Sequence, residues 1–196
     1  MPEPENPETA TVSASADSDP DASLMLAVGT GDEAALRILI NKWQNPLINF
    51  FYRSVNSRPL AEDLTQVLFV KLYQAAPRYE PTAKFSTYLF AIARRLLINE
   101  FRKQQRKPLE PVDPADLGGS VSGRQPLETM EIEEAFRYAL TELPDNHREA
   151  ILLFKQQELS YQEIAEVMGA PESSVKTWIF RARQKLKASL QDLFES

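Results

Sequence analysis

Apolar residues recur at intervals of three and four along most of this chain, which is the spacing of one face of an α-helix. The clearest example is the series Leu64, Leu68 and Leu72, which continues to Ala75. Glycine is scarce, and no Asn-Gly or Asp-Gly pair lies between alternating apolar runs, so no β-hairpin is indicated. The pattern therefore predicts an all-α protein.

The helical pattern is interrupted once, between Arg106 and Leu127, where proline and glycine are frequent and large apolar residues are few. Such a composition is typical of a linker. Residues 1–22 are rich in proline, serine and acidic residues and contain almost nothing large to bury, so we expect a disordered acidic tail there. The sequence therefore predicts two small helical domains, at residues 23–105 and 128–196, joined by a flexible linker at residues 106–127.

The acidic charge of the chain is concentrated in the tail. The formal net charge is −6, and the tail has no Lys or Arg to offset its acids, which are Glu3, Glu5, Glu8, Asp17, Asp19 and Asp21. Cysteine is absent, which excludes disulfides, thiolate metal sites and a cysteine nucleophile. Because the sequence shows neither a secretory signal nor an apolar run of bilayer length, we expect a cytoplasmic protein without direct membrane insertion.

A helix-turn-helix is indicated near the C-terminus by the segment LSYQEIAEVMGAPE. Ser160 followed by Glu163 forms the capping box that starts a helix. Gly169 suits the left-handed position at its end, and Pro171 prevents the helix from continuing. A short helix, a tight turn and a longer second helix are the elements with which many proteins read the DNA major groove.

The second helix of this motif has one apolar side, and the stretch 173–187 contains five cations and no acid. At 100° per residue the apolar stripe consists of Val175, Ile179, Ala182 and Leu186, with Trp178 at its border. The opposite face and its flank contain Ser173, Ser174, Thr177, Phe180, Arg181, Gln184, Lys176, Arg183 and Lys187. Such residues can contact base edges and phosphates. The alternative is a solvated helix kept soluble by its lysines.

A second basic helix is predicted at residues 85–106. Its inward side consists of Phe85, Leu89, Ile92, Ala93 and Leu96. One outward stripe contains Tyr88, Arg95, Asn99, Arg102 and Arg106, with Lys84 just before it. An aromatic ring among cations can stack on an unpaired base while the cations hold the backbone, although an ordinary surface helix would show the same pattern. Two such elements joined by a linker gain affinity for one nucleic acid through effective concentration.

The helix predicted at residues 61–74 is apolar on two sides. Leu64, Leu68 and Leu72 form the first side. The second side contains Asp63, Gln66, Phe69, Val70 and Tyr73, with Glu62 beside it. A mixed polar and aromatic stripe suits a protein partner, and the alternative is a helix buried between its neighbours.

Together these segments resemble the extracytoplasmic-function (group 4) sigma factors of the sigma-70 family, over about residues 24–192. The resemblance is carried by AEDLTQ, then FSTYLFAIARRLLINEFRK, then LPDNHREAILLFKQQELSYQEIAEVMGAPESSVKTWIFRARQKL, in this order. It implies an interchangeable subunit that brings core RNA polymerase of bacteria to selected promoters and helps to open them. It also implies that the chain is not an enzyme and needs no catalytic residue, metal or cofactor.

The resemblance further implies three binding surfaces. The surface for the clamp helices of the largest polymerase subunit would be Glu62, Asp63, Gln66, Phe69, Val70 and Tyr73. The surface for the −10 promoter element would be Arg78, Tyr79, Lys84, Ser86, Thr87, Tyr88, Arg95, Asn99, Arg102 and Lys103. The surface for the −35 element would be Ser173, Ser174, Lys176, Thr177, Phe180, Arg181, Arg183, Gln184 and Lys187. The C-terminal domain is expected to contact the β flap of the polymerase, and an inhibitory anti-sigma protein is implied.

Three residues depart from what is frequent in this family. Val67 stands where Glu is frequent, Tyr88 where Trp is frequent, and Trp178 where Arg is frequent. The linker length agrees with the resemblance. About 22 extended residues reach at most about 75 Å, and promoter elements about 17 base pairs apart are separated by about 58 Å.

Two other interpretations are open. A helix-turn-helix regulator that never engages polymerase would leave the two-sided helix at residues 61–74 unexplained. An enzyme would need a catalytic group, and the single histidine, His147, lies at an expected helix start, where a surface or capping role is typical. The sequence contains no phosphate-binding glycine loop and no metal-ligand cluster.

Overall fold

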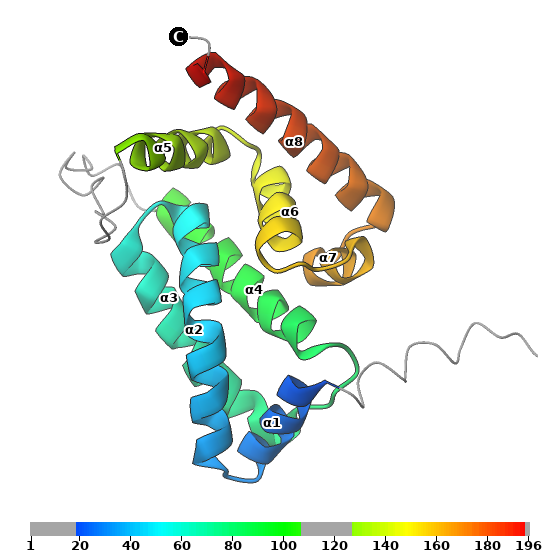
Figure 1. Cartoon of the computed structure of the whole chain (residues 1–196). Coiled ribbons are helices and arrows are strands. Elements are labelled where there is room, and N and C mark those ends of the chain that lie inside the picture. The colour runs from blue at the N-terminus through cyan, green and yellow to red at the C-terminus, as the bar shows by residue number, and fades with distance from the viewer. Residues whose placement is uncertain (1–18, 107–126, 195–196) are drawn as a thin grey trace, which may run out of the picture.

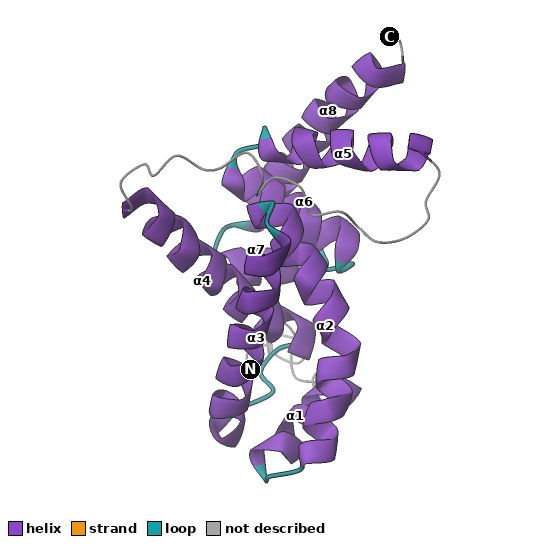
Figure 2. Ribbon diagram, turned by 90° about the vertical axis from the view of Figure 1, so that its left-hand side faces the viewer, coloured by secondary structure: helices purple, strands orange, loops and turns teal. Residues whose placement is uncertain are grey.

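All regular structure in the computed structural model, which describes residues 19–106 and 127–194, is helical (Figure 2). The N-terminal part contains α1 (Pro20–Gly29), α2 (Glu33–Val55), α3 (Arg58–Ala75), the short 3-10 helix η2 (Ala76–Arg78) and α4 (Phe85–Arg106). The C-terminal part contains α5 (Leu127–Thr141), α6 (Asp145–Gln156), α7 (Tyr161–Met168) and α8 (Glu172–Phe194). The all-α prediction is confirmed. Most of the expected acidic tail and nearly all of the expected linker lie outside the described residues.

The N-terminal domain is built on the hairpin of α2 and α3. Asn56 ends α2 in the left-handed conformation, with φ of 53°, and the Ser57 side chain caps the first turn of α3. Helix α4 lies against both helices (Figure 1) and buries Phe85 and Phe90 completely. The rings of Phe50 and Phe90 meet edge to face, with centroids 5.3 Å apart, a geometry that aromatic pairs favour.

Helix α1 begins at Pro20, so the expectation that the acidic tail extends to residue 22 was wrong at its end. The two carboxylate oxygens of Asp19 serve two helices. Oδ1 accepts a hydrogen bond from the Asp21 backbone N–H at 3.0 Å, at the start of α1. Oδ2 accepts one from the Phe85 backbone N–H at 2.7 Å, at the start of α4. A single carboxylate thereby joins the beginnings of two helices that are far apart in sequence.

Two further contacts hold α1 in place. The buried Asp21 carboxylate accepts hydrogen bonds from Lys42 Nζ at 2.6 Å and from Trp43 Nε1 at 3.1 Å, both on α2. Gly29 lies so close to η2 that a Cβ there would be 2.6 Å from the Ala76 carbonyl oxygen. Any larger side chain at Gly29 would therefore push α1 away from η2.

The C-terminal domain contains the predicted helix-turn-helix as α7 and α8. The capping box is present, because Ser160 Oγ accepts from the Glu163 backbone N–H while Glu163 Oε2 accepts from the Ser160 backbone N–H. Gly169 ends α7 with φ of 60° in the left-handed region. Both local predictions are confirmed.

The two domains touch each other. Helix α7 lies beside α4, and α6 lies beside α2 (Figure 1). Within residues 19–106 and 127–194, no helix is both long enough and apolar enough to cross a membrane.

We predict that Asp19→Ala lowers the free energy of unfolding by about 2 kcal/mol, because two helix caps of about 1 kcal/mol each are lost. The loss for Asp19→Asn should be smaller than the loss for Asp19→Ala, because the amide keeps one acceptor oxygen where the carboxylate has two. Asp32→Ala is the matched control, because Asp32 caps only α2. Urea unfolding of the three variants checks this, and equal losses for Asp19→Ala and Asp32→Ala would contradict it.

Candidate nucleic-acid and protein interfaces

The buried and exposed sides of helix α8 are those that the periodicity predicts. Val175, Ile179, Ala182 and Leu186 are buried against the rest of the C-terminal domain. On the opposite face Ser174 is half-buried. The other side chains of this face are exposed, namely Ser173, Thr177, Phe180, Arg181 and Gln184. Phe180 has 61% of its surface exposed, which is unusual for so large an apolar side chain. Trp178 is half-buried against the core.

Two of the cations beside this face lie over a pair of aromatic rings. Phe154 of α6 and Tyr161 of α7 are stacked, with centroids 5.2 Å apart and planes 10° from parallel. The Arg183 guanidinium lies 4.9 Å from the Phe154 centroid, and Lys176 Nζ lies 5.7 Å from the Tyr161 centroid. Stacking uses the flat side of a guanidinium and leaves its N–H edges free for a phosphate. The sequence did not indicate this pair, because stacking between different helices leaves no periodic signal.

His147 lies in the first turn of α6, close to Arg181 on the exposed face of α8. Burial and the nearby positive charge of Arg181 both lower the pKa of His147. The expectation that His147 lies at a helix start is confirmed. Its electrostatic coupling to Arg181 could not be read from the sequence.

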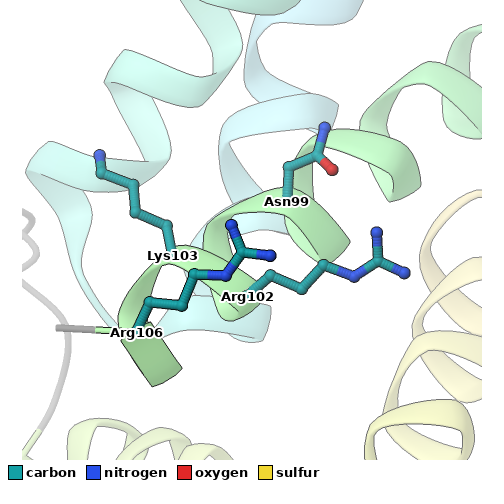
Figure 3. Close-up of a pocket in the computed structure, with 4 residues that line it drawn as sticks. All are labelled: Asn99, Arg102, Lys103 and Arg106. Carbon is teal, nitrogen blue, oxygen red and sulfur yellow. The ribbon is translucent and has the colours of Figure 1, made fainter.

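Helix α4 also has the predicted faces. Phe85, Leu89, Ala93 and Leu96 are buried and Ile92 is half-buried, whereas Arg95, Asn99, Arg102 and Lys103 are exposed. An open hollow of about 470 Å³ lies between the last turn of α3 and residues 88–99 of α4, with Tyr88, Arg95 and Asn99 on its α4 side. A second hollow, of about 500 Å³, lies at the end of α4 and is lined by Asn99, Arg102, Lys103 and Arg106 (Figure 3).

The segment around the start of α4 differs from the expectation for a DNA surface. Arg78 is exposed and Ser86 is half-buried, but Tyr79 and Thr87 are buried, with 7% and 4% of their surfaces exposed. Burial, with a smaller effect of Asp19, raises the pKa of Tyr79 to about 12. Neither the Tyr79 hydroxyl nor the Thr87 hydroxyl has a hydrogen-bond partner among the described residues. In this conformation neither side chain is exposed to solvent, and their assignment to the −10 surface stays a prediction.

Lys84 and Tyr88 are also engaged within the protein. Lys84 Nζ forms an ion pair with Glu163 Oε1 of α7 at 2.8 Å. Tyr88 is half-buried, and its ring centroid lies 5.0 Å from that of Tyr79. The structure thus brings the aromatic residues of the predicted −10 surface together, with the C-terminal domain beside them.

The second stripe of α3 faces solvent in the described structure. Glu62, Asp63 and Gln66 are exposed, Phe69 is half-buried, and Val70 and Tyr73 have 56% and 54% of their surfaces exposed. The stripe is therefore not buried between neighbouring helices. Tyr73 also borders a hollow of about 320 Å³, whose other lining residues, on α2, are Glu33, Leu36, Arg37 and Ile40. The α2 residues were not predicted, because only the packing of α2 against α3 brings them to this stripe.

Comparisons with known proteins agree with this two-part architecture. The family model "Sigma-70 region 2" matches residues 39–107, and "Sigma-70, region 4" matches residues 133–186. The ECF RNA polymerase sigma factor SigM of Bacillus subtilis (strain 168) is 35% identical over 149 residues, which cover 74% of this chain and 89% of SigM. This chain belongs to the ECF sigma factors. SigW of the same organism is 30% identical over 179 residues, which cover 85% of the chain and 94% of SigW.

Solved structures show the same fold. The structure of CnrH in complex with the cytosolic domain of CnrY superposes with a TM-score of 0.68 at 23% identity and covers 89% of this ECF sigma factor and 99% of that chain. The sigma factor RpoE in complex with the anti-sigma factor NepR from Bartonella quintana superposes with a TM-score of 0.65 at 24% identity. The match covers 79% of this chain and 96% of that chain. At these identities the likeness concerns the two-domain helical fold alone.

We predict that Arg181→Ala raises the pKa of His147, because a nearby positive charge that disfavours imidazolium is removed. A lowered folded-state pKa means that stability is lost as pH falls through the ordinary value of about 6.5, so this loss should be smaller in the variant. His147 is the only histidine, and NMR therefore gives one imidazole titration curve. Arg183→Ala, which removes a cation held over Phe154, is the control and should leave the curve unchanged; a shift equal to that of Arg181→Ala would contradict the assignment.

Proposed function

We propose that this ECF sigma factor binds core RNA polymerase, directs it to promoters that carry −10 and −35 elements, and starts transcription there. The observation that carries the proposal is that both sigma regions are present and each has an exposed basic helix face, on α4 and on α8. The surfaces serve binding, so we assign the chain no enzymatic activity of its own. Its place of action would be the cytoplasm, where polymerase and chromosome meet.

The exposed stripe of α3 is the proposed contact with the clamp helices of the largest polymerase subunit. It combines the carboxylates of Glu62 and Asp63 with the apolar surface of Val70 and Tyr73. A partly apolar centre with a polar rim is the usual composition of a protein interface. Val67, which replaces a residue that is frequently Glu in the family, is 43% exposed and enlarges the apolar part of this surface.

The −10 element would be opened along α4. The stripe of Arg95, Asn99 and Arg102 offers charge to the phosphate backbone, and Tyr88 beside the α3–α4 hollow offers a ring on which an unpaired base can stack. Lys103 and Arg106 extend the charge towards the end of the helix (Figure 3).

The −35 element would be read by α8, and the C-terminal domain would also contact the β flap of the polymerase. The exposed Thr177, Phe180 and Arg181 suit base edges, since Phe180 can touch a thymine methyl group and Arg181 can donate to guanine. Lys176, Arg183 and Lys187 suit phosphates. An anti-sigma protein is the proposed inhibitor, because CnrH and RpoE are each described in complex with a protein of their own, CnrY and the anti-sigma factor NepR.

The proposed polymerase contact predicts that Tyr73→Ser weakens binding to core RNA polymerase about tenfold, since a tyrosine that becomes buried in an interface can contribute more than about 1 kcal/mol. Tyr138→Ser is the matched control, because Tyr138 is 70% exposed on α5, away from the proposed contact. Affinity is measured with purified core enzyme, and run-off transcription gives the functional readout. A wild-type chain that forms no complex with core would favour a regulator that does not engage polymerase.

The proposed reading of the −35 element predicts different effects for two cations of α8. Arg181→Ala should cost about 1–3 kcal/mol on the preferred −35 sequence and little on other sequences. Lys187→Ala should weaken binding to all sequences alike and reduce the salt slope by about one. Binding of the complete polymerase to matched and scrambled −35 elements at several salt concentrations checks both. If Arg181→Ala weakened both elements equally, the assignment of this face to the groove would fail.

A further inference from the structure

Three cations of the C-terminal domain gather around the stacked rings of Phe154 and Tyr161. The Arg183 guanidinium lies 4.9 Å from the centroid of the Phe154 ring, and Lys155 Nζ lies 5.8 Å from the same centroid. Lys176 Nζ lies 5.7 Å from the centroid of the Tyr161 ring. All three distances are within the reach of a cation–π interaction. The ring pair thus brings together positive charges from α6 and α8 that are distant in sequence.

The two cations beside Phe154 are exposed and have no acidic partner within residues 19–106 and 127–194, where neither Lys155 nor Arg183 forms an ion pair. Lys176 differs, because it pairs with Glu172 at 2.6 Å. Two positive charges beside one ring repel each other, and an anion between them would replace that repulsion by attraction. A phosphate suits this position, since guanidinium and ammonium groups form strong charge-assisted hydrogen bonds with phosphate oxygens.

The ring pair lies at the edge of the α8 face that would read the −35 element. Lys176 and Arg183 flank that face on the side of Phe180, at 100° per residue. Tyr161 is the first residue of α7, and α7 is the first helix of the helix-turn-helix. In such motifs the first helix crosses the DNA backbone while the second lies in the major groove. The backbone of one strand is therefore expected to pass beside the rings.

A cation held over a ring is better prepared for a phosphate than a free one. Phe154 and Tyr161 are half-buried against the core, and their planes are 10° from parallel, so packing fixes both rings. A long side chain loses rotamer freedom when it is immobilised on binding, and a restrained side chain has less to lose. Lys187 offers the comparison, because this exposed cation of the same helix lies over no ring of the described residues.

We propose that Phe154 and Tyr161 are positioning residues that hold three cations against the backbone of one strand of the −35 element. Those cations are Lys155, Lys176 and Arg183. Lys155 is thereby a further phosphate contact, and it comes from α6, outside the helix-turn-helix. The rings act through the cations, so they strengthen binding to every sequence alike and carry no base preference. This inference rests on the proposed −35 function of α8.

The first test is a double-mutant cycle on the affinity of the complete polymerase for matched and scrambled −35 elements. Phe154→Leu removes the ring, keeps an apolar side chain, and should weaken binding to both elements about fivefold. In an Arg183→Ala background the same change should cost at most about twofold, because the cation that the ring holds is already gone. In a Lys187→Ala background, the matched control, the loss should stay about fivefold. Phe154→Tyr keeps a ring and should bind like the wild type.

The second test concerns Lys155 and uses the salt dependence of the same binding. Lys155→Ala should reduce the salt slope by about one on matched and scrambled elements alike. Lys185→Ala is the matched control, because the Lys185 ammonium donates to the Glu142 carbonyl oxygen instead of lying over the rings, and it should leave the slope unchanged. Thermal unfolding identifies any variant that fails to fold. If Phe154→Leu fails, Tyr161→Leu with Lys176→Ala carries the cycle.

Equal losses from Phe154→Leu in the Arg183→Ala and Lys187→Ala backgrounds would mean that the ring supports only the fold, and would overturn the proposal. An unchanged salt slope for Lys155→Ala would overturn it as well. A failure of the proposed −35 function would give a different result. Polymerase with the wild-type chain would then bind matched and scrambled elements equally, and Arg183→Ala would weaken neither.

Discussion

Helix α4 faces the core on one side, solvent on a second side and the C-terminal domain on a third. The arrangement of the other helices depends on which residues of α4 lie on each side. One side is sealed in the core by Phe85 and Phe90, a second presents Arg95 and Arg102 to solvent, and a third meets α6 and α7. A helix of about 33 Å can serve all three because its faces are fixed by the rotation of 100° per residue. The Asp19 carboxylate, which caps the first turn of α4, joins that turn to the start of α1.

The C-terminal domain carries opposite charges on two of its sides. Its outer helix α8 exposes Arg181, Arg183 and Lys187, whereas the side towards α4 contributes Glu149 and Glu163. One small domain can therefore attract the DNA backbone with one side and a basic helix with the other. The overall charge of −6 hides this division, because most of the acid that produces it lies in the first residues of the chain.

Much of the candidate site was predictable because it depends on local rules. Capping residues and a glycine turn define α7, and the apolar period fixes which side of α8 is buried, so Thr177 and Arg181 were assigned to the outer face from periodicity alone. The resemblance assigned Tyr79 and Thr87 to the −10 surface, and the structure shows both side chains buried. Their burial depends on packing between segments distant in sequence, which no local pattern records. The same applies to the stacking of Phe154 on Tyr161.

By itself, the sequence determined helices α3, α4, α7 and α8 and the inward and outward faces of α4 and α8, because these follow from residue spacing along one chain. The order of the two sigma regions followed from the resemblance of its motifs to a known family. The sequence also determined that α3 carries a second stripe, but only the structure decided that this stripe is exposed. The tertiary structure alone decided that Asp19 joins α1 to α4 and that Glu149 and Glu163 reach Arg94 and Lys84. Those pairings join residues far apart in sequence, and their geometry depends on how whole helices pack. Spacing and composition leave that packing open.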